Sequence, residues 1–363
     1  MRDWYKPLTP LLRRLPAETA HRSALWALER GLVPAPRLGN DPILAVKAFG
    51  RDLPNPVGLA AGFDKNARVF IPAARLGFGF IEAGGVTPRP QEGNPRPRLF
   101  RLEEDRALIN RMGFNNEGLD AFARRIESHP RGDLFLAVNL ASNAASLDPA
   151  EDYVVLTRRL APLADLVVVD VSCPNTANGR LFQSRAPLAD LLGRLKPVRG
   201  KTPMALKVSP DLTDKEKADI LDLALEHRID GMVIANTTVA RPASLASVHR
   251  GERGGLSGPP VKEMALRLLA ETYKAAQGRL TLVGVGGIAS GADAYRRILA
   301  GASLVQLYTA LVYEGPLLVP RLKAELAYLL RRDGFTSAAA AVGAGHAPSG
   351  VNEPRNTAIA VEF

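Results

Sequence analysis

Short apolar runs alternate with segments of helical periodicity eight times between residues 55 and 332, and this alternation is what most limits the possible folds. The candidate strands are 55–60, 79–84, 134–140, 165–171, 203–208, 230–235, 280–285 and 303–307. The candidate helices that follow them are 66–76, 117–128, 149–161, 186–196, 214–227, 261–276, 290–300 and 316–332. Eight strand–helix units predict an α/β fold, a (β/α)₈ TIM barrel. A doubly wound parallel sheet is the alternative, although it usually has fewer strands and divides into two halves.

Composition excludes several other classes of protein. The 363 residues are 46% hydrophobic and 23% charged, which is typical of globular chains and not of disordered or fibrous ones. A single cysteine cannot form an internal disulfide or a Cys-rich zinc module, and the five histidines show no paired spacing, so we expect no metal site. No apolar run reaches the roughly 18 residues of a membrane-spanning helix. No secretory signal is expected, since the N-terminus has no apolar stretch followed by a small-residue cleavage site.

The N-terminal 38 residues carry seven Lys and Arg against three acidic residues, an excess within the overall net charge of +10. Two amphipathic helices are predicted here, separated by Pro16. Their apolar positions are Trp4, Leu8, Leu11, Leu12, Leu15, Ala24, Leu25, Leu28 and Leu32. The pattern fits a module that lies on a membrane surface. It also fits a helical pair that packs on the main domain with its arginines in solvent.

Polar and glycine-rich residues follow the predicted strands, and in a barrel these strand ends meet at one rim. Lys65 and Lys207 end apolar strands, where a lysine needs an anionic partner such as a carboxylate or an electron-rich ring. The pair Gly286-Gly287 precedes a helix, so its N–H groups can bind phosphate, with a simple tight turn as the alternative. Four asparagines share the rim and suit a planar heterocycle: Asn110, Asn139, Asn175 and Asn236.

Cys173 lies directly after the fourth predicted strand. A lone cysteine is most often an inert core residue, but a loop position at the rim favours a chemical role. A thiol has an unperturbed pKa of about 8.5, close enough to neutral to be tuned for proton abstraction. No histidine is near Cys173 in the sequence, which favours a general base over a protease-like nucleophile.

Eight motifs occur in the order in which they occur in one flavoenzyme family. They are Leu-Ala-Ala-Gly-Phe-Asp-Lys (59–65), Val-Thr-Pro-Arg-Pro-Gln (86–91), Asn-Pro-Arg-Pro-Arg-Leu-Phe-Arg (94–101), Asn-Arg-Met-Gly-Phe-Asn-Asn (110–116), Ser-Cys-Pro-Asn-Thr (172–176), Asn-Thr-Thr (236–238), Gly-Gly-Leu-Ser-Gly (254–258) and Gly-Val-Gly-Gly-Ile (284–288). On these motifs the chain resembles dihydroorotate dehydrogenase over residues 1 to about 332. It is most similar to the quinone-dependent class 2.

The resemblance implies an FMN bound across the barrel mouth and a set of residues around it. FMN would contact Ala61, Gly62, Phe63, Asp64, Lys65, Gly85, Asn139, Asp170, Lys207, Ala235, Gly258, Gly287, Tyr308 and Thr309. Dihydroorotate would contact Lys65, Asn110, Arg111, Met112, Gly113, Phe114, Asp170, Asn175, Asn236 and Thr237. Cys173 would be the base that removes a proton from C5 while C6 transfers hydride to the flavin, which yields orotate in pyrimidine synthesis.

Some positions depart from the usual class 2 pattern. Cys173 stands where class 2 usually has Ser, and cysteine is the choice of the soluble class 1 enzymes. Asp170 stands where Asn is usual, and a carboxylate beside an electron-rich flavin is unfavourable unless it is protonated or paired. Gly85 and Ala235 replace hydroxyl side chains, so their contacts must come from the backbone. The N-terminal helical pair still favours class 2, because class 1 enzymes lack it.

In class 2 the N-terminal pair forms an apolar entrance through which quinone reaches the flavin at the bilayer. The resemblance places Leu8, Leu11, Leu12, Leu25 and Trp26 along this entrance, with His21 and Arg101 as polar groups of the quinone site. It implies a peripheral protein on the cytoplasmic face of the cell (inner) membrane that reduces a membrane quinone, ubiquinone. The expected organisation is residues 1–38 as this module, 39–332 as the FMN barrel and 333–363 as a low-complexity, disordered tail.

Two other functions fit the sequence less well. A related FMN barrel reduces uridine in tRNA, but its cysteine acts as an acid, and no RNA-binding domain is expected after this barrel. A nucleic-acid-binding protein needs a basic stripe with aromatic stacking groups, and only 6% of the residues are aromatic. We therefore expect no nucleic-acid partner.

Overall fold

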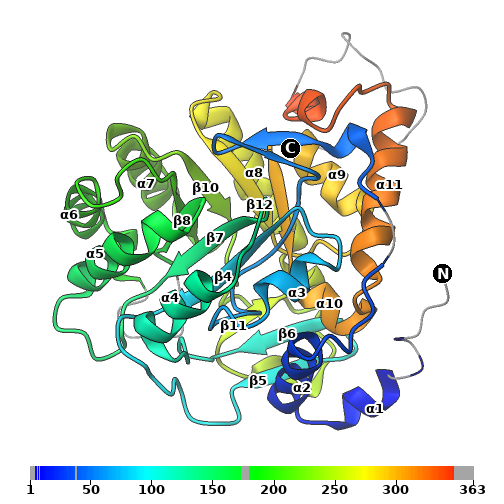
Figure 1. The fold of residues 1–363 in the computed structure, drawn as a ribbon. Coiled ribbons are helices and arrows are strands. Elements are labelled where there is room, and N and C mark those ends of the chain that lie inside the picture. Colours follow the sequence, from blue (N-terminus) through cyan, green and yellow to red (C-terminus); the bar gives the residue numbers. More distant parts are fainter. Residues whose placement is uncertain (1–4, 6, 8, 37–38, 173–179, 347–363) are drawn as a thin grey trace.

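Eight parallel strands close into a barrel in the computed structural model, which describes residues 5, 7, 9–36, 39–172 and 180–346. Around the barrel the strands are β3 (Val57–Leu59), β4 (Phe80–Val86), β7 (Phe135–Leu140), β8 (Leu166–Asp170), β9 (Met204–Val208), β10 (Gly231–Ile234), β12 (Thr281–Val285) and β13 (Leu304–Leu307), which pairs with β3 again. Each lies within or beside a predicted strand. The predicted (β/α)₈ barrel is therefore confirmed, as Figure 1 shows.

The barrel strands read as almost uninterrupted apolar runs because both of their faces are covered. In β8 and β9 every residue is buried, and their pairing places Asp170 directly beside Lys207 at the carboxyl ends. The strands therefore place charged side chains at the mouth, on top of a core of Val, Leu, Ile and Ala.

Helices cover the outside of the barrel (Figure 1). They are α3 (Phe70–Ala74), α4 (Gly118–Ser128), α5 (Pro149–Leu160), α6 (Arg185–Leu195), α7 (Asp214–Glu226), α8 (Lys262–Ala276), α9 (Gly291–Leu299) and α11 (Leu318–Arg332). Several begin at capping side chains, such as Asp148 before α5, Ser290 before α9, and the capping box of Thr213 and Glu216 at α7. α3 is shorter than the predicted 66–76 because Asp64 organises the preceding turn.

Two small sheets and the helix α10 (Thr309–Glu314) were not predicted. These strands and this helix are too short to show a clear hydrophobic period. The hairpin of β1 (Val46–Ala48) and β2 (Arg51–Leu53) carries Phe49, which packs on Phe135 at the start of β7 and so lies at the amino end of the barrel. At the other end β5 (Leu99–Leu102), β6 (Ala107–Asn110) and β11 (Gly255–Ser257) form an antiparallel sheet with its own small core. The additional helix α10 (Thr309–Glu314) follows β13.

The predicted N-terminal helical pair is present as α1 (Thr9–Arg14) and α2 (Ala17–Glu29). Both lie at the lower end of the molecule in Figure 1, beside β5 and α10. Leu8 and the side chain of Leu11 lie outside the described residues. Among the residues that the structure describes, no helix is long and apolar enough to cross a membrane.

The expectation of disorder after residue 333 is wrong for the part of the tail that the structure describes. Residues 339–341 and 344–346 form helical turns, with Ala338 and Ala341 buried. His346 stacks on Tyr273 of α8 with ring centroids 5.1 Å apart. Disorder was predicted because the segment is low in complexity. Its small alanines and glycines instead allow it to pack closely. Residues 347–363 lie outside the described residues.

Candidate active site

The carboxyl ends of the barrel strands surround a cavity of about 190 Å³ beneath the β5–β6–β11 sheet. Most of the predicted site residues line it together. They are Ala61, Gly62, Lys65, Gly85, Asn110, Met112, Gly113, Phe114, Asn139, Asp170, Lys207, Ala235, Asn236, Thr237, Gly258, Gly287, Tyr308 and Thr309. We call this space the mouth cavity.

The remaining predicted site residues have other surroundings. Phe63 turns away from the mouth and packs against His21 and Tyr308. The Asp64 carboxylate accepts hydrogen bonds from the backbone of Asn66, Arg68 and Val69, so it organises a turn, and its burial raises its pKa.

Three predicted site residues remain: Arg111, Cys173 and Asn175. The Arg111 guanidinium pairs with Glu252 at 2.7 Å and lies over the Phe100 ring, outside the cavity lining. Cys173 and Asn175 lie outside the described residues, so their predicted roles remain predictions.

A fully buried carboxylate, Glu82 of β4, orients the polar groups at the floor of the mouth cavity. It accepts hydrogen bonds from Asn139 Nδ2 at 2.7 Å and Gln306 Nε2 at 2.6 Å, and Lys207 Nζ lies 3.4 Å from it. Because an ionised carboxylate only accepts, both amide NH₂ groups must face it. The two amide oxygens are therefore the atoms left for another partner.

Those two oxygens, Asn139 Oδ1 and Gln306 Oε1, are buried and have no hydrogen-bond partner among the described residues. Buried polar atoms are almost always satisfied, so such orphans at a cavity point to a missing ligand. At Gly85 a Cβ atom would lie 3.0 Å from Asn139 Oδ1 and 2.9 Å from the Phe114 ring. The floor thus fits a flat, close-lying heterocycle with N–H donors at its edge.

Two lysines reach the mouth from opposite directions. Lys207 belongs to β9 and is held between Glu82 and Asp170. Lys65 donates to the Gly62 carbonyl at 2.7 Å, and its burial lowers its pKa to about 8. A bound anion would favour the charged form of Lys65, which matches its predicted role at a substrate carboxylate.

Asp170 faces the mouth cavity and is hydrogen-bonded rather than bare. Its Oδ1 accepts from the Ser172 N–H at 3.0 Å and the Ser172 hydroxyl at 2.9 Å, and Asn236 Nδ2 lies 3.2 Å from Oδ2. Desolvation raises the pKa of Asp170, and the Lys207 cation opposes this shift. The Asp170 carboxylate is therefore paired. A paired carboxylate meets the requirement stated for an acidic residue beside an electron-rich flavin.

Glycines and hydroxyl groups form the side of the mouth at β11, β12 and β13. Gly258 has a φ of +100°, and a Cβ there would lie 2.9 Å from the Arg106 carbonyl oxygen. Gly287 has a φ of +71°, and a Cβ there would lie 2.8 Å from Lys262 Cβ, so both positions require glycine. The Thr309 hydroxyl donates to Ser257 at 2.8 Å. These residues line the mouth cavity on the side where the Gly286-Gly287 pattern predicts a phosphate site, which remains a prediction.

Arg297 of α9 supports this rim from behind. It is almost fully buried and donates to the carbonyls of Gly286 and Lys262, both at 2.7 Å. Its burial lowers its pKa to about 10, so it stays a cation at neutral pH. Lys262 itself pairs with Asp293 at 2.7 Å.

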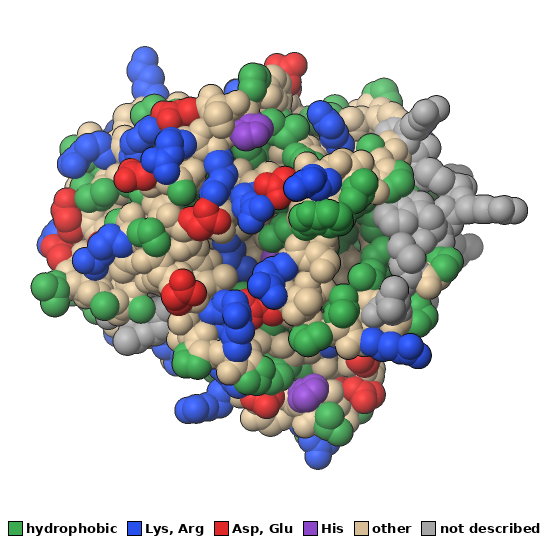
Figure 2. Space-filling view, turned by 60° about the horizontal axis from the view of Figure 1, so that its bottom comes forward, with side chains coloured by type: hydrophobic (Ala, Val, Ile, Leu, Met, Phe, Trp, Pro, Cys, Tyr) green, Lys and Arg blue, Asp and Glu red, His purple; other side chains and the backbone are tan. Residues whose placement is uncertain are grey.

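A second cavity of about 480 Å³ lies between the N-terminal helices, β5 and α10; we call it the helical cavity. It shares five lining residues with the mouth cavity: His21, Leu99, Leu108, Tyr308 and Tyr313. Figure 2 shows apolar side chains around a hollow on this face, with Lys and Arg side chains at its border. Leu12 and Trp26 line the helical cavity as predicted, whereas Leu25 packs against the barrel core instead.

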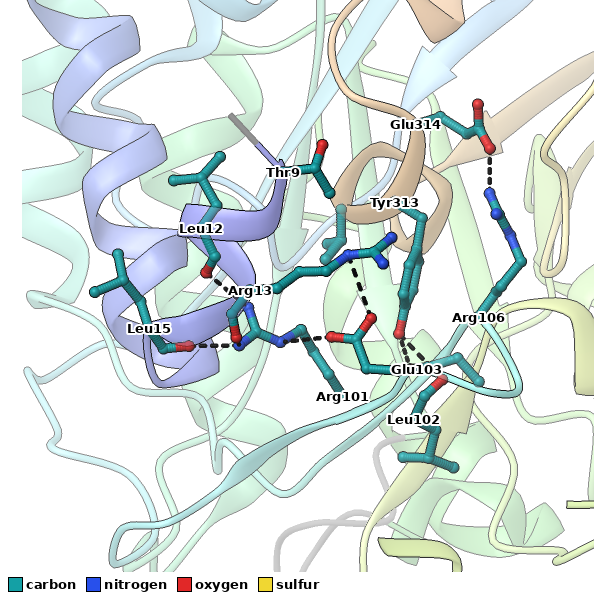
Figure 3. Close-up of polar contacts among 12 residues, drawn as sticks. Thr9, Leu12, Arg13, Leu15, Arg101, Leu102, Glu103, Arg106, Tyr313 and Glu314 are labelled. Carbon is teal, nitrogen blue, oxygen red and sulfur yellow. Dashed lines mark hydrogen bonds and ion pairs between the residues drawn. The ribbon is translucent and has the colours of Figure 1, made fainter. Parts of the chain in front are cut away.

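His21 and Arg101, the two expected polar groups of this entrance, both line the helical cavity. Burial lowers the pKa of His21 to about 3, so the imidazole is neutral at physiological pH. Arg101 donates to the carbonyls of Leu12, Arg13 and Leu15 at the end of α1 and pairs with Glu103, as Figure 3 shows. Cations at a helix carboxyl end are stabilising, so Arg101 also anchors α1.

Glu82 and Gln306 are the main site residues that the sequence reasoning missed. Each is a polar residue within an otherwise apolar barrel strand, in Phe-Ile-Glu-Ala and Leu-Val-Gln-Leu. That signal could have identified them, because an unpaired polar residue is costly in a strand covered on both faces. Ser257 and Arg106 also line the mouth, but Ser257 lies on the short sheet that was not predicted and Arg106 lies in the turn between its strands β5 and β6.

Comparison with known proteins matches this arrangement to one family. A family profile described as dihydroorotate dehydrogenase matches residues 43–330. A Rhodospirillum rubrum protein named dihydroorotate dehydrogenase (quinone) is 52% identical over 95% of this chain and 96% of its own length. The mitochondrial protein of that name from Mus musculus is 46% identical over 93% of this chain and 89% of its own length. A crystal structure of the Eimeria tenella enzyme in complex with ferulenol is similar at a TM-score of 0.88, with 38% identity over 91% of this chain and 96% of that one.

Proposed function

The chain belongs to the dihydroorotate dehydrogenase family, and on that premise we propose that it oxidises (S)-dihydroorotate to orotate and passes the electrons to a membrane quinone in pyrimidine synthesis. The observation that carries this proposal is the contact between two cavities. The mouth cavity has the lysines and amides for an anionic heterocycle, and the helical cavity has the apolar lining for a quinone. Five shared side chains separate them, so two substrates can react in turn at one centre between them.

The family is flavin-dependent, and we assign FMN as the cofactor. When bound, FMN supplies the two-electron acceptor that makes the oxidation of a carbon–carbon bond possible. The orphaned oxygens of Asn139 and Gln306 are suited to its ring edge, and Lys207 is placed to offset negative charge on the ring. Gly258, Gly287 and Thr309 are suited to its phosphate end.

Other residues of this chain would orient the substrate, remove its proton and exclude water. Lys65 and the amides of Asn110 and Asn236 line the mouth cavity, where they can orient a substrate carboxylate and ring amides. Cys173, three residues beyond Asp170, would take the proton from C5. The β5–β6–β11 sheet lies over the mouth and would keep water from the reacting carbons.

We place the protein at a membrane surface, as a peripheral protein on the cytoplasmic face of the cell (inner) membrane, with ubiquinone as the acceptor. Trp26 and Leu32 are more than half exposed beside the helical cavity. Basic side chains border the same face in Figure 2, which favours an anionic bilayer. No nucleic acid is needed to account for the positive charge.

The test is an anaerobic spectral titration of the purified protein. It should be yellow, dihydroorotate should bleach it, and a ubiquinone analogue should restore the colour faster than fumarate or NAD. A colourless protein, or a flavin untouched by dihydroorotate, would refute the proposed reaction. Faster reoxidation by fumarate or NAD would refute the quinone assignment alone.

A further inference from the structure

Glu18, in the first turn of α2, reaches out of the N-terminal module to a buried arginine of the main domain. Arg98 Nη2 lies 2.7 Å from Glu18 Oε1, and Arg98 Nε lies 3.1 Å from Oε2. The exposed fraction of the Arg98 side chain is 4% and that of Glu18 is 15%. A two-bond arginine–carboxylate pair of this kind is both strong and fixed in direction. It ties α2 to the residue just before β5.

The same guanidinium also holds the turn at residues 92–94. Arg98 Nη1 donates to the carbonyl oxygens of Glu92 and Asn94, the latter at 3.0 Å. Gly93 in this turn has a φ of +75°, and a Cβ there would lie 2.2 Å from the Met112 carbonyl oxygen and 3.0 Å from Arg98 Nη1. The turn is therefore packed between the arginine and the loop at residues 110–114.

The turn at residues 92–94 supports the loop at residues 110–114. Four residues of that loop line the mouth cavity. The Asn94 N–H donates to the Met112 carbonyl at 3.1 Å, and Asn94 Nδ2 donates to the Arg111 carbonyl at 2.9 Å. The Arg111 N–H donates to the Arg98 carbonyl at 2.9 Å. A continuous set of hydrogen bonds thus runs from α2 through Arg98 to the backbone that faces the substrate.

We propose that Glu18 is a positioning residue for this loop, so that α2 serves dihydroorotate binding as well as quinone access. The inference rests on the proposed function, because it assigns the loop to dihydroorotate. Without the Glu18 carboxylate Arg98 keeps its buried charge but loses its counter-ion, a costly arrangement that drives the guanidinium toward solvent or another acceptor. The carbonyls of Glu92 and Asn94 then lose their donor, and the loop loses its support.

Glu18 acts on the substrate site by a second route, through Lys65. The carboxylate of Glu18 and the guanidinium of Arg98 act on Lys65 with opposite sign, and the Glu18 charge favours the protonated lysine. Loss of the Glu18 charge removes the larger of the two carboxylate contributions at Lys65 and leaves Asp64 alone to oppose the repulsion by Arg98. Both routes weaken the binding of an anionic substrate at the mouth cavity.

The test compares Glu18→Gln with Glu29→Gln, a matched change on the same helix. Glu29 also pairs with an arginine, Arg68 at 2.7 Å, but both side chains are exposed and neither lines the mouth cavity. Calorimetric titration of the full-length, FMN-loaded protein with orotate should give a Kd about tenfold higher for Glu18→Gln. The KM for dihydroorotate with a soluble dye as acceptor should rise in step, with kcat and the quinone KM little changed. Glu29→Gln should stay within about twofold of the wild type.

The results distinguish a failure of the inference from a failure of the proposed function. Wild-type affinity for orotate in a Glu18→Gln protein that retains its flavin would overturn the inference, as would an equal loss in Glu29→Gln. A wild-type protein that binds no orotate would instead refute the proposed function. Glu18→Asp keeps the charge and is expected to fall between wild type and Glu18→Gln. This variant also provides the measurement if Glu18→Gln does not fold, and wild-type binding by Glu18→Asp would then count against the inference.

Discussion

The two cavities of this molecule are neighbours, but they are built in opposite ways. The mouth cavity rests on the ends of barrel strands whose neighbours are fixed by hydrogen-bonded pairing, and its Lys207 is held beside Glu82 and Asp170. The helical cavity is enclosed by two short helices, two strands of a small sheet and α10. Its lining is largely apolar, and Leu28 is the one described residue of α2 that is buried.

The difference indicates which cavity tolerates change. Strand ends in a closed barrel cannot shift without breaking several pairings, which suits chemistry that depends on positions accurate to a fraction of an ångström. A helix pair that contributes little buried surface can adjust to a long apolar substrate at modest cost. Substitutions at the mouth should therefore affect the rate of flavin reduction, whereas substitutions in the helical cavity should affect the acceptor alone.

The largest effect is expected at the mouth, from Cys173→Ala. Loss of a general base slows a reaction by roughly 10²–10⁴-fold, so flavin reduction by dihydroorotate should slow by that amount in stopped-flow measurements. Cys173→Ser serves as the conservative control and should recover part of the rate at raised pH, because a hydroxyl loses its proton less readily than a thiol. A near-wild-type rate in Cys173→Ala would move the role of base to another residue.

A smaller effect, confined to the acceptor, is expected from Ala27→Phe in the helical cavity. Ala27 lines that cavity and not the mouth cavity, so a phenyl ring there occupies space that a quinone would need. We expect the KM for a ubiquinone analogue to rise by roughly 10-fold to 100-fold in steady-state assays, as for a misfitted apolar pocket. Turnover with a soluble dye should stay close to wild type.

The control for this variant is Ala186→Phe, which places the same ring on an exposed position of α6. It should leave both assays unchanged. Equal losses with quinone and dye in Ala27→Phe would mean that the two cavities are not separable in function, and the contrast between them would fail.

The mouth cavity could be predicted from the sequence, whereas the helical cavity could not. The eight strands and the convergence of Lys65, Lys207 and Asn139 followed from periodicity, because the barrel brings all strand ends to one rim. The helical cavity could not be derived in this way, because it depends on how α1 and α2 pack against β5 and α10, which periodicity does not determine. The pair of Glu18 and Arg98 is 80 residues apart along the chain and leaves no local signal.

The smallest effect is expected at the outer edge of the helical cavity, from Trp26→Ala. The Trp26 side chain is 52% exposed and lies on α2 beside Arg30, whose guanidinium is 5.9 Å from the ring centroid. Transfer of an aromatic ring of this kind into a bilayer interface contributes on the order of 1–2 kcal/mol, so its loss should weaken sedimentation with anionic vesicles about tenfold. Leu147→Ala is the control, because that side chain is fully exposed in the loop before α5 and should not contribute. If both variants bound vesicles like the wild type, the membrane would contact some other face, and the apolar rim of the helical cavity would serve the quinone only.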